Sequence, residues 1–207
     1  MTMTPPSPAH TIEELCKRSH FISKEKGWVN EDGTDPRSFA AIIVLMHSEL
    51  SEAMEDWRNN KKIDEKYYEP LPNEIVRTET TVTQPAKPCG IPIELADLVI
   101  RVAQYVGTAG DAAEFGSMCG DEASHYDGVF ETYLAEAHVC LSMAYNDDAD
   151  EMLTEEESKR SRLTWLAHAI DNTFAFCKKT GIDLWAAIDE KEAYNRTRPI
   201  RHGGKKV

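Results

Sequence analysis

The chain of 207 residues contains only five cysteines and no C-x-x-C pair. The cysteines are odd in number and scattered, which argues against a disulfide framework or a zinc ribbon. No stretch reaches the ~20 consecutive apolar residues that a membrane-spanning helix needs. The first residues also lack the basic and apolar regions of a secretory signal. We therefore expect a cytoplasmic protein with reduced thiols and no membrane partner.

The sequence also lacks the glycine-rich phosphate-binding motifs G-x-x-x-x-G-K-[ST] and G-x-G-x-x-G, and the G-x-S-x-G turn of serine hydrolases. Positive charge is scarce too, since 23 Lys and Arg residues stand against 36 Asp and Glu residues and give a net charge of −13. A chain this acidic is repelled by nucleic acid, so we expect no stable binding to a nucleic-acid polymer. The basic segment 191–206 can still bind a small polyanion locally.

Apolar residues recur at helical spacing along most of the chain, which predicts the all-α class. Thr11 and Glu14 have the spacing of a capping box, and Gly107 and Gly110 are expected to end the third helix. The expected helices span about 11–26, 38–59, 91–106, 129–145, 158–179 and 184–194.

The stretches between these helices differ in character. Residues of about 61–90 hold four prolines and a β-branched run, which predicts a proline-rich, β-prone insertion that forms a short hairpin or an extended loop. Glycines are expected to keep 110–128 irregular. We expect 1–10 to be a flexible N-terminal arm and 11–207 to be a single domain. The apolar helices indicate a homo-oligomer, either a dimer or a tetramer.

Two of the expected helices carry acids three residues apart, Glu49 with Glu52 and Glu94 with Asp97. Residues at this spacing share one helical face, so antiparallel packing of the two helices would bring four carboxylates together. Such carboxylates repel one another unless a cation neutralises them. All-oxygen ligands favour Mg²⁺, with Mn²⁺ as a second possibility. Each pair alone is common on a solvated acidic helix, but both pairs lie in apolar helices, which favours a metal site.

The segments around these acids resemble the MazG-like all-α nucleoside triphosphate pyrophosphohydrolases. The likeness lies in HFISKEKGW, IIVLMHSELSEAMEDWRNN, PCGIPIELADLVIRVAQYVG and GIDLWAAIDEKEAYNRTRPIRHGGKKV. The resemblance implies a MazG-like helical bundle that hydrolyses (deoxy)nucleoside triphosphates to the monophosphate and pyrophosphate. Water would attack the α-phosphorus, for nucleotide-pool sanitation or balance. The catalytic metal ligands that it implies are Glu49, Glu52, Glu94 and Asp97.

The resemblance also implies residues that bind the substrate. In the C-terminal signature, Arg198 would grip phosphate as a fork and Lys191 would act as a point charge. Tryptophans are candidates for stacking on a nucleobase, although large aromatic side chains on helices more often belong to the core. The residues expected at the substrate site are Lys191, Asn195, Arg198, Lys24, Trp28 and Trp57, with His20, His202 and Lys205 as further candidates.

The chain is longer than the short members of that family. The gap from Glu52 to Glu94 allows an added loop over the substrate, and an extra helix pair at about 129–179 lies within residues 111–180. Leu134-Ala-Glu-Ala echoes Leu50-Ser-Glu-Ala, and Leu166-Ala-His echoes Leu95-Ala-Asp. We hypothesise that 111–180 is a degenerate repeat whose helices have lost their acids and pack against the catalytic pair.

Two other functions stay open at this point. A di-iron carboxylate bundle needs E-x-x-H on two helices, and this chain has one such motif, from Glu122 to His125. A non-catalytic nucleotide-binding or regulatory protein could use the same helical scaffold. The four intact acids favour an enzyme, and release of pyrophosphate in the presence of Mg²⁺ would distinguish the two.

Overall fold

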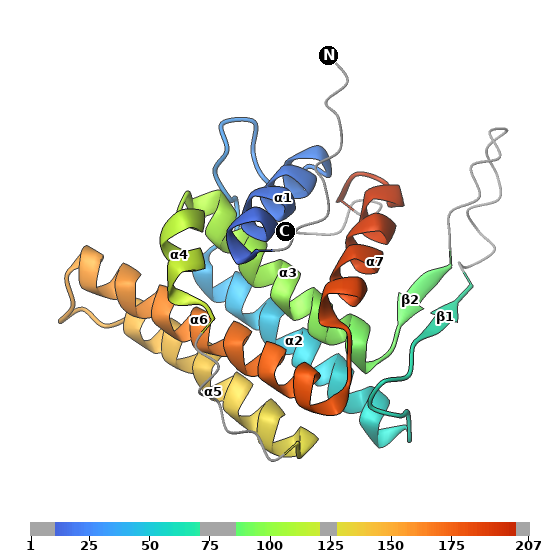
Figure 1. The fold of residues 1–207 in the computed structure, drawn as a ribbon. Coiled ribbons are helices and arrows are strands. Elements are labelled where there is room, and N and C mark those ends of the chain that lie inside the picture. The colour runs from blue at the N-terminus through green and yellow to red at the C-terminus, as the bar shows by residue number, and fades with distance from the viewer. Residues whose placement is uncertain (1–10, 71–85, 121–127, 202–207) are drawn as a thin grey trace, which may run out of the picture.

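The computed structural model describes residues 11–70, 86–120 and 128–201. Within these residues the chain is mostly helical, which confirms the all-α character, and it adds one antiparallel hairpin (Figure 1). The helices are α1 (Ile12–Glu25), α2 (Phe39–Arg58), α3 (Ile91–Ala109), α4 (Ala112–Met118), α5 (Phe130–Asp148), α6 (Glu155–Thr180) and α7 (Leu184–Thr197), and the strands are β1 (Tyr67–Glu69) and β2 (Lys87–Cys89).

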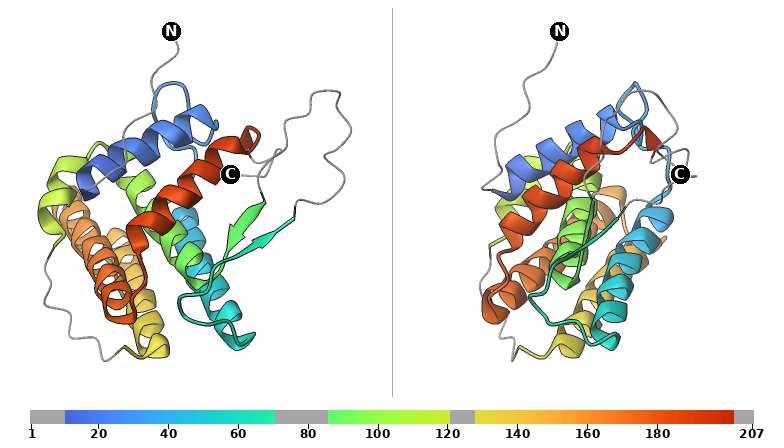
Figure 2. Two further views of the ribbon diagram at one scale, coloured as in Figure 1. Left: turned by 45° about the vertical axis from the view of Figure 1, so that its right-hand side comes forward. Right: turned by 90° about the vertical axis from the view of Figure 1, so that its right-hand side faces the viewer.

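Helix α3 lies at the centre of the molecule. Helices α1 and α7 pack against it on one side, while α2 and α6 contact it on another, and α5 completes the bundle against α2 and α6 (Figure 2). Twelve of the 19 residues of α3 are buried, because neighbours surround it on several faces. An almost continuous apolar helix is the sequence pattern that such a position requires.

The helix ends follow local capping chemistry. Thr11 and Glu14 form the predicted capping box at the start of α1, and a second box of Thr154 and Glu157 starts α6 three residues before the predicted position of Ser158. Helix α3 continues through Gly107 and ends only at Gly110, whose φ of 85° is left-handed. The prediction that Gly107 ends this helix is therefore wrong.

The stretch expected to be irregular contains the short helix α4. Its Gly116 lies inside the helix, where an added Cβ would come within 3.0 Å of the Glu13 side chain on α1, so this glycine permits close packing. Helix α7 is also longer than expected, since it continues to Thr197 instead of ending at about 194. The prediction of an irregular segment is therefore wrong for 112–118, and the predicted end of the last helix falls three residues short.

The insertion after α2 forms a short hairpin in which Tyr67 pairs with Cys89 and Glu69 pairs with Lys87. The Tyr67 hydroxyl donates a hydrogen bond to Asp56 of α2 at 2.9 Å. The Tyr68 hydroxyl donates to Glu190 of α7 at 2.6 Å. The hairpin therefore connects α2 to α7. The β-branched run that predicted it, at 76–83, lies outside the described residues, as does the expected arm at 1–10.

Helices α5 and α6 form the expected extra pair and pack along each other and against α2 and α3. Tyr133 precedes the Leu134 motif as Glu49 precedes the Leu50 motif. It is fully buried, and its hydroxyl lies 2.9 Å from that of Thr173. This tyrosine belongs to the core. The origin of the pair as a degenerate repeat stays a prediction, as do the single domain and self-association. Among the described helices, none is both long and apolar enough to span a bilayer.

Replacing Gly107 by alanine should lower the melting temperature. An alanine inside a helix usually stabilises it by about 1 kcal/mol relative to glycine. Here the added Cβ would lie 2.2 Å from the backbone oxygen of Cys16, so α1 would have to move away from α3. Thermal denaturation followed by circular dichroism measures the effect. An unchanged or higher melting temperature would show that the two helices can separate without cost.

Candidate metal centre

Helices α2 and α3 bring three of the four predicted acids together. Oxygen atoms of Glu49, Glu94 and Asp97 lie within 4.8 Å of one another, and this group could hold a metal ion. Glu49 and Glu94 are only 2% and 4% exposed, so neither is part of a solvated acidic surface. The spacing of three residues between Glu94 and Asp97 puts both on the same face of α3.

The start of α3 fixes the position of Glu94. Gly90 precedes the helix with a φ of 115°, and a Cβ at this position would lie 2.2 Å from the backbone oxygen of Glu65. Only glycine fits there without displacing the chain before the hairpin. Glu94 lies in the first turn of α3, where the helix dipole favours a negative charge.

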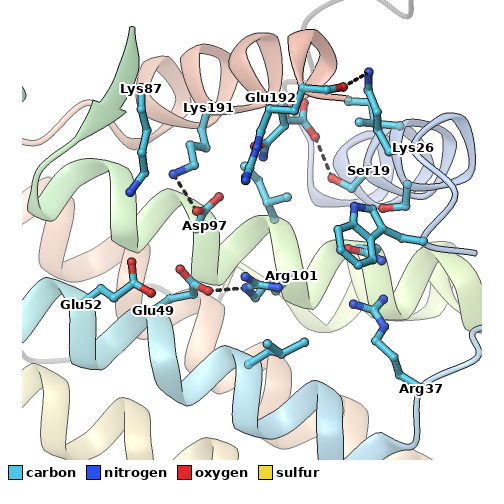
Figure 3. Close-up of a pocket in the computed structure, with 18 residues that line it drawn as sticks. Ser19, Lys26, Arg37, Glu49, Glu52, Lys87, Asp97, Arg101, Lys191 and Glu192 are labelled. Atoms are coloured by element: carbon cyan, nitrogen blue, oxygen red, sulfur yellow. Dashed lines mark hydrogen bonds and ion pairs between the residues drawn. The ribbon is translucent and has the colours of Figure 1, made fainter. Parts of the chain in front are cut away.

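Two cations hold the acids in place (Figure 3). Arg101 Nε donates to Glu49 Oε1 at 2.5 Å, and Lys191 Nζ from α7 donates to Asp97 Oδ2 at 2.7 Å. Burial disfavours the charge of Lys191, but Asp97 and Glu94 outweigh this effect and raise its pKa. Three carboxylates against two cations leave the group with an excess of negative charge when all are ionised.

Burial makes that ionisation difficult. It raises the pKa of Glu49 to about 7, against the opposing effect of Arg101, and the charges of Asp97 and Glu52 raise it further. Burial likewise raises the pKa of Glu94 to about 8, with Lys191 opposing and Asp97 adding to the rise. A divalent cation would supply the missing positive charge. The all-oxygen donor set fits a hard ion such as Mg²⁺ or Mn²⁺.

Glu52, the fourth predicted ligand, lies beside this group and is exposed. Its side chain lines the same cavity as Glu49 and Asp97 (Figure 3). It is close enough to add to the effect of burial on the pKa of both Glu49 and Glu94. Its role as a ligand stays a prediction.

Glu49, Glu52 and Asp97 open on a cavity of about 280 Å³ between α1, α2, α3, α7 and β2. Its walls carry both signs of charge. The acidic lining residues are Glu49, Glu52, Asp97 and Glu192, and the basic ones are Lys26, Arg37, Lys87, Arg101, Lys191 and Arg198. Carboxylates that can hold a metal, next to several cations, suit a ligand that carries phosphate groups.

Four of the predicted substrate residues line this cavity. Lys191, Asn195 and Arg198 reach it from α7 and its C-terminal cap, and half-buried Trp28 reaches it from the loop after α1. The buried Oδ1 atom of Asn195 has no hydrogen-bond partner among the described residues. A buried acceptor of this kind favours a ligand that donates a hydrogen bond.

The other predicted binding residues lie elsewhere. Trp57 is at the end of α2, where its Nε1 donates to Glu131 at 2.9 Å and its ring meets Phe130 of α5 edge-on. Lys24 is exposed on α1 and does not line the cavity. Sequence alone could not show that α5 covers this end of α2 or that Lys24 faces solvent. We therefore remove Trp57 and Lys24 from the candidate site.

The remaining candidates add nothing to the cavity. His20 does not line it, and its Nδ1 lies 3.0 Å from the Thr108 hydroxyl. His202 and Lys205 lie outside the described residues, as does the Glu122–His125 motif of the di-iron alternative.

Sequence reasoning missed several residues of the cavity. Gln104 follows Asp97 by seven residues and Arg101 by three, so the helical stripe that begins at Glu94 was a signal for it. Lys87 and Arg37 had no such signal, because strand pairing and a loop bring them in.

Comparison of the chain with models of protein families, with curated proteins and with solved structures finds no match. A function can therefore be proposed only from the chemistry of the site and from its sequence motifs.

Without metal, the stability of the protein should fall as the pH rises from about 5 to 8. The folded-state pKa values of Glu49 and Glu94 are raised, so the folded state holds more protons than the unfolded chain in this range. Mg²⁺ should relieve the repulsion between the ionised acids. It should therefore raise the melting temperature more at pH 8 than at pH 6, as measured by thermal denaturation with and without MgCl₂.

The double variant Glu49→Gln with Glu94→Gln provides the control. It keeps the shape of both side chains but removes both titrating carboxyl groups, so the effect of Mg²⁺ should become small and independent of pH. An equal effect of Mg²⁺ on the variant and on the wild-type protein would exclude these acids as the metal site.

Proposed function

We propose that the protein hydrolyses (deoxy)nucleoside triphosphates to the monophosphate and pyrophosphate in a Mg²⁺-dependent reaction, with Mn²⁺ as a possible substitute. The observation that carries the proposal is the group formed by Glu49, Glu94 and Asp97, two of which, Glu49 and Asp97, line a cavity that is also lined by six cationic side chains. The resemblance of these segments to the MazG-like pyrophosphohydrolases supports the same reaction. It also favours a role in nucleotide-pool sanitation or balance.

The three carboxylates, with Glu52 as a fourth candidate, would hold the metal. Arg101 binds Oε1 of Glu49 and Lys191 binds Oδ2 of Asp97, which leaves the second oxygen of each carboxylate for coordination. A Mg²⁺ ion at this position would neutralise phosphate oxygens and lower the pKa of a bound water.

In the proposed reaction, the oxygen of a water molecule forms a bond to the α-phosphorus. The bond from that phosphorus to the oxygen bridging to the β-phosphorus breaks, and its electron pair leaves with pyrophosphate. The proton from water passes to a carboxylate of the site or to solvent. The cations of the cavity stabilise the negative charge that develops on the phosphate oxygens.

The remaining lining residues have roles that follow from their chemistry. Arg198 presents a planar guanidinium suited to bind two phosphate oxygens at once. Asn195 offers its unpartnered Oδ1 atom to a sugar hydroxyl. Trp28 offers an aromatic surface on which a nucleobase can stack.

Incubation with a panel of ribo- and deoxynucleoside triphosphates and Mg²⁺ should release pyrophosphate and the monophosphate. Separate assays for pyrophosphate and orthophosphate, each without added pyrophosphatase, identify the bond that breaks. Direct release of orthophosphate from the γ position would contradict attack at the α-phosphorus. Binding of nucleotide without turnover would instead favour the non-catalytic regulatory alternative.

Replacing Glu52 by glutamine should lower turnover by about 100-fold or more, because it removes a negative charge from the metal site. The fold should persist, because Glu52 is exposed. Glu55→Gln is the matched control, since Glu55 is exposed on the same helix and does not line the cavity. Steady-state kinetics with circular dichroism measures both effects, and full activity in Glu52→Gln would remove this residue from the site.

A further inference from the structure

The cavity extends lengthwise along α3. Lys87 lies just before this helix, and Asp97, Arg101 and Gln104 follow along it. Asp97 and Gln104 are seven residues apart, which corresponds to roughly 10 Å along the helix axis. Lys87 and Arg37 lie at opposite ends of the cavity, with Asp97 and Glu49 between them (Figure 3).

Trp28 and Arg37 both belong to the loop between α1 and α2, and both line the cavity. Glu13 of α1 faces Gly116, and Cys16 faces Gly107, so α1 runs antiparallel to this part of the chain. The last turn of α1 therefore lies toward Gln104 rather than toward Ala109, the C-terminal end of α3. The backbone nitrogen of Trp28 donates to the Ser23 carbonyl at 3.0 Å, which ties the tryptophan to that last turn.

The two ends of the cavity offer different chemistry. At one end, half-buried Lys87 forms no ion pair with any described residue, whereas Arg37, Arg101 and Lys191 are each bound to a carboxylate. A partly buried ammonium without such a partner favours an anionic ligand. At the other end, Gln104 is only 8% exposed, and its Nε2 has no hydrogen-bond partner among the described residues.

The hairpin holds Lys87 in a defined position. Lys87 pairs with Glu69 in the two-stranded ladder, next to the pair formed by Tyr68 and Pro88. The Tyr68 hydroxyl and Lys66 Nζ both bind Glu190 of α7, at 2.6 and 2.7 Å. These contacts distinguish Lys87 from an exposed lysine on an unsupported loop.

We propose that the substrate lies along α3 with its leaving pyrophosphate at Lys87 and its nucleoside at the end formed by Trp28 and Gln104. This inference rests on the proposed function. Negative charge increases on pyrophosphate as its bond to the α-phosphorus breaks, and an ammonium group held at that position stabilises it. At the other end, Trp28 stacks on the nucleobase while the Gln104 amide donates a hydrogen bond to a polar atom of the nucleoside.

The two products test this orientation separately. Isothermal titration calorimetry with Mg²⁺ gives the affinity for inorganic pyrophosphate and for dAMP, dCMP, dGMP, dTMP and dUMP. Lys87→Met should weaken pyrophosphate binding about tenfold or more and leave the tightest monophosphate within about twofold. Trp28→Leu should weaken binding of the tightest monophosphate about tenfold or more and leave pyrophosphate binding within about twofold. Lys87→Arg should retain pyrophosphate affinity, because it keeps the charge.

Lys62→Met is the matched control, since Lys62 is exposed just before the hairpin and outside the cavity, and it should change neither affinity. Circular dichroism confirms that each variant is folded. Equal weakening of both products by either variant, or unchanged pyrophosphate binding in Lys87→Met, would overturn the orientation. If the wild-type protein still releases pyrophosphate from nucleotides, the proposed function survives that result. Wild-type protein that binds neither product would overturn both.

Discussion

The burial of three carboxylates against two cations is the constraint on which the rest of the site depends. Glu49 and Glu94 lie among apolar residues of α2 and α3, where an uncompensated negative charge is costly. Arg101 and Lys191 offset part of that cost, and the raised pKa values of the two glutamates show that the compensation is incomplete. A site of this kind attracts a divalent cation because the ion completes the charge balance.

Helix α3 connects this charge arrangement to the fold. It supplies Glu94 and Asp97 to the acidic group and Arg101 and Gln104 to the cavity, while its other faces pack in the core. The close contact at Gly107 draws α1 against it, and α7 brings Lys191 to Asp97. The same packing that buries α3 therefore gathers cations from distant parts of the sequence around the acids.

The sequence predicted most helices, since their ends depend on contacts within a few residues. Examples of such local helix ends are the capping box of Thr11 and Glu14, which starts α1, and the left-handed Gly181, which follows α6. Gly107 was misread as a helix end, because only the contact with α1 reveals that it permits close approach. The helix at 112–118 was missed for a related reason, since its glycine serves packing against α1 and does not end the helix.

By itself the sequence determined the two acid pairs, because a spacing of three residues on a helix fixes a shared face whatever surrounds it. Only the tertiary structure decided which side chains meet them. It brought Lys87 to the cavity through strand pairing, left Glu52 exposed at the edge, and turned Trp57 toward α5. Local backbone geometry is encoded in neighbouring residues, whereas the convergence of distant side chains depends on how whole helices pack.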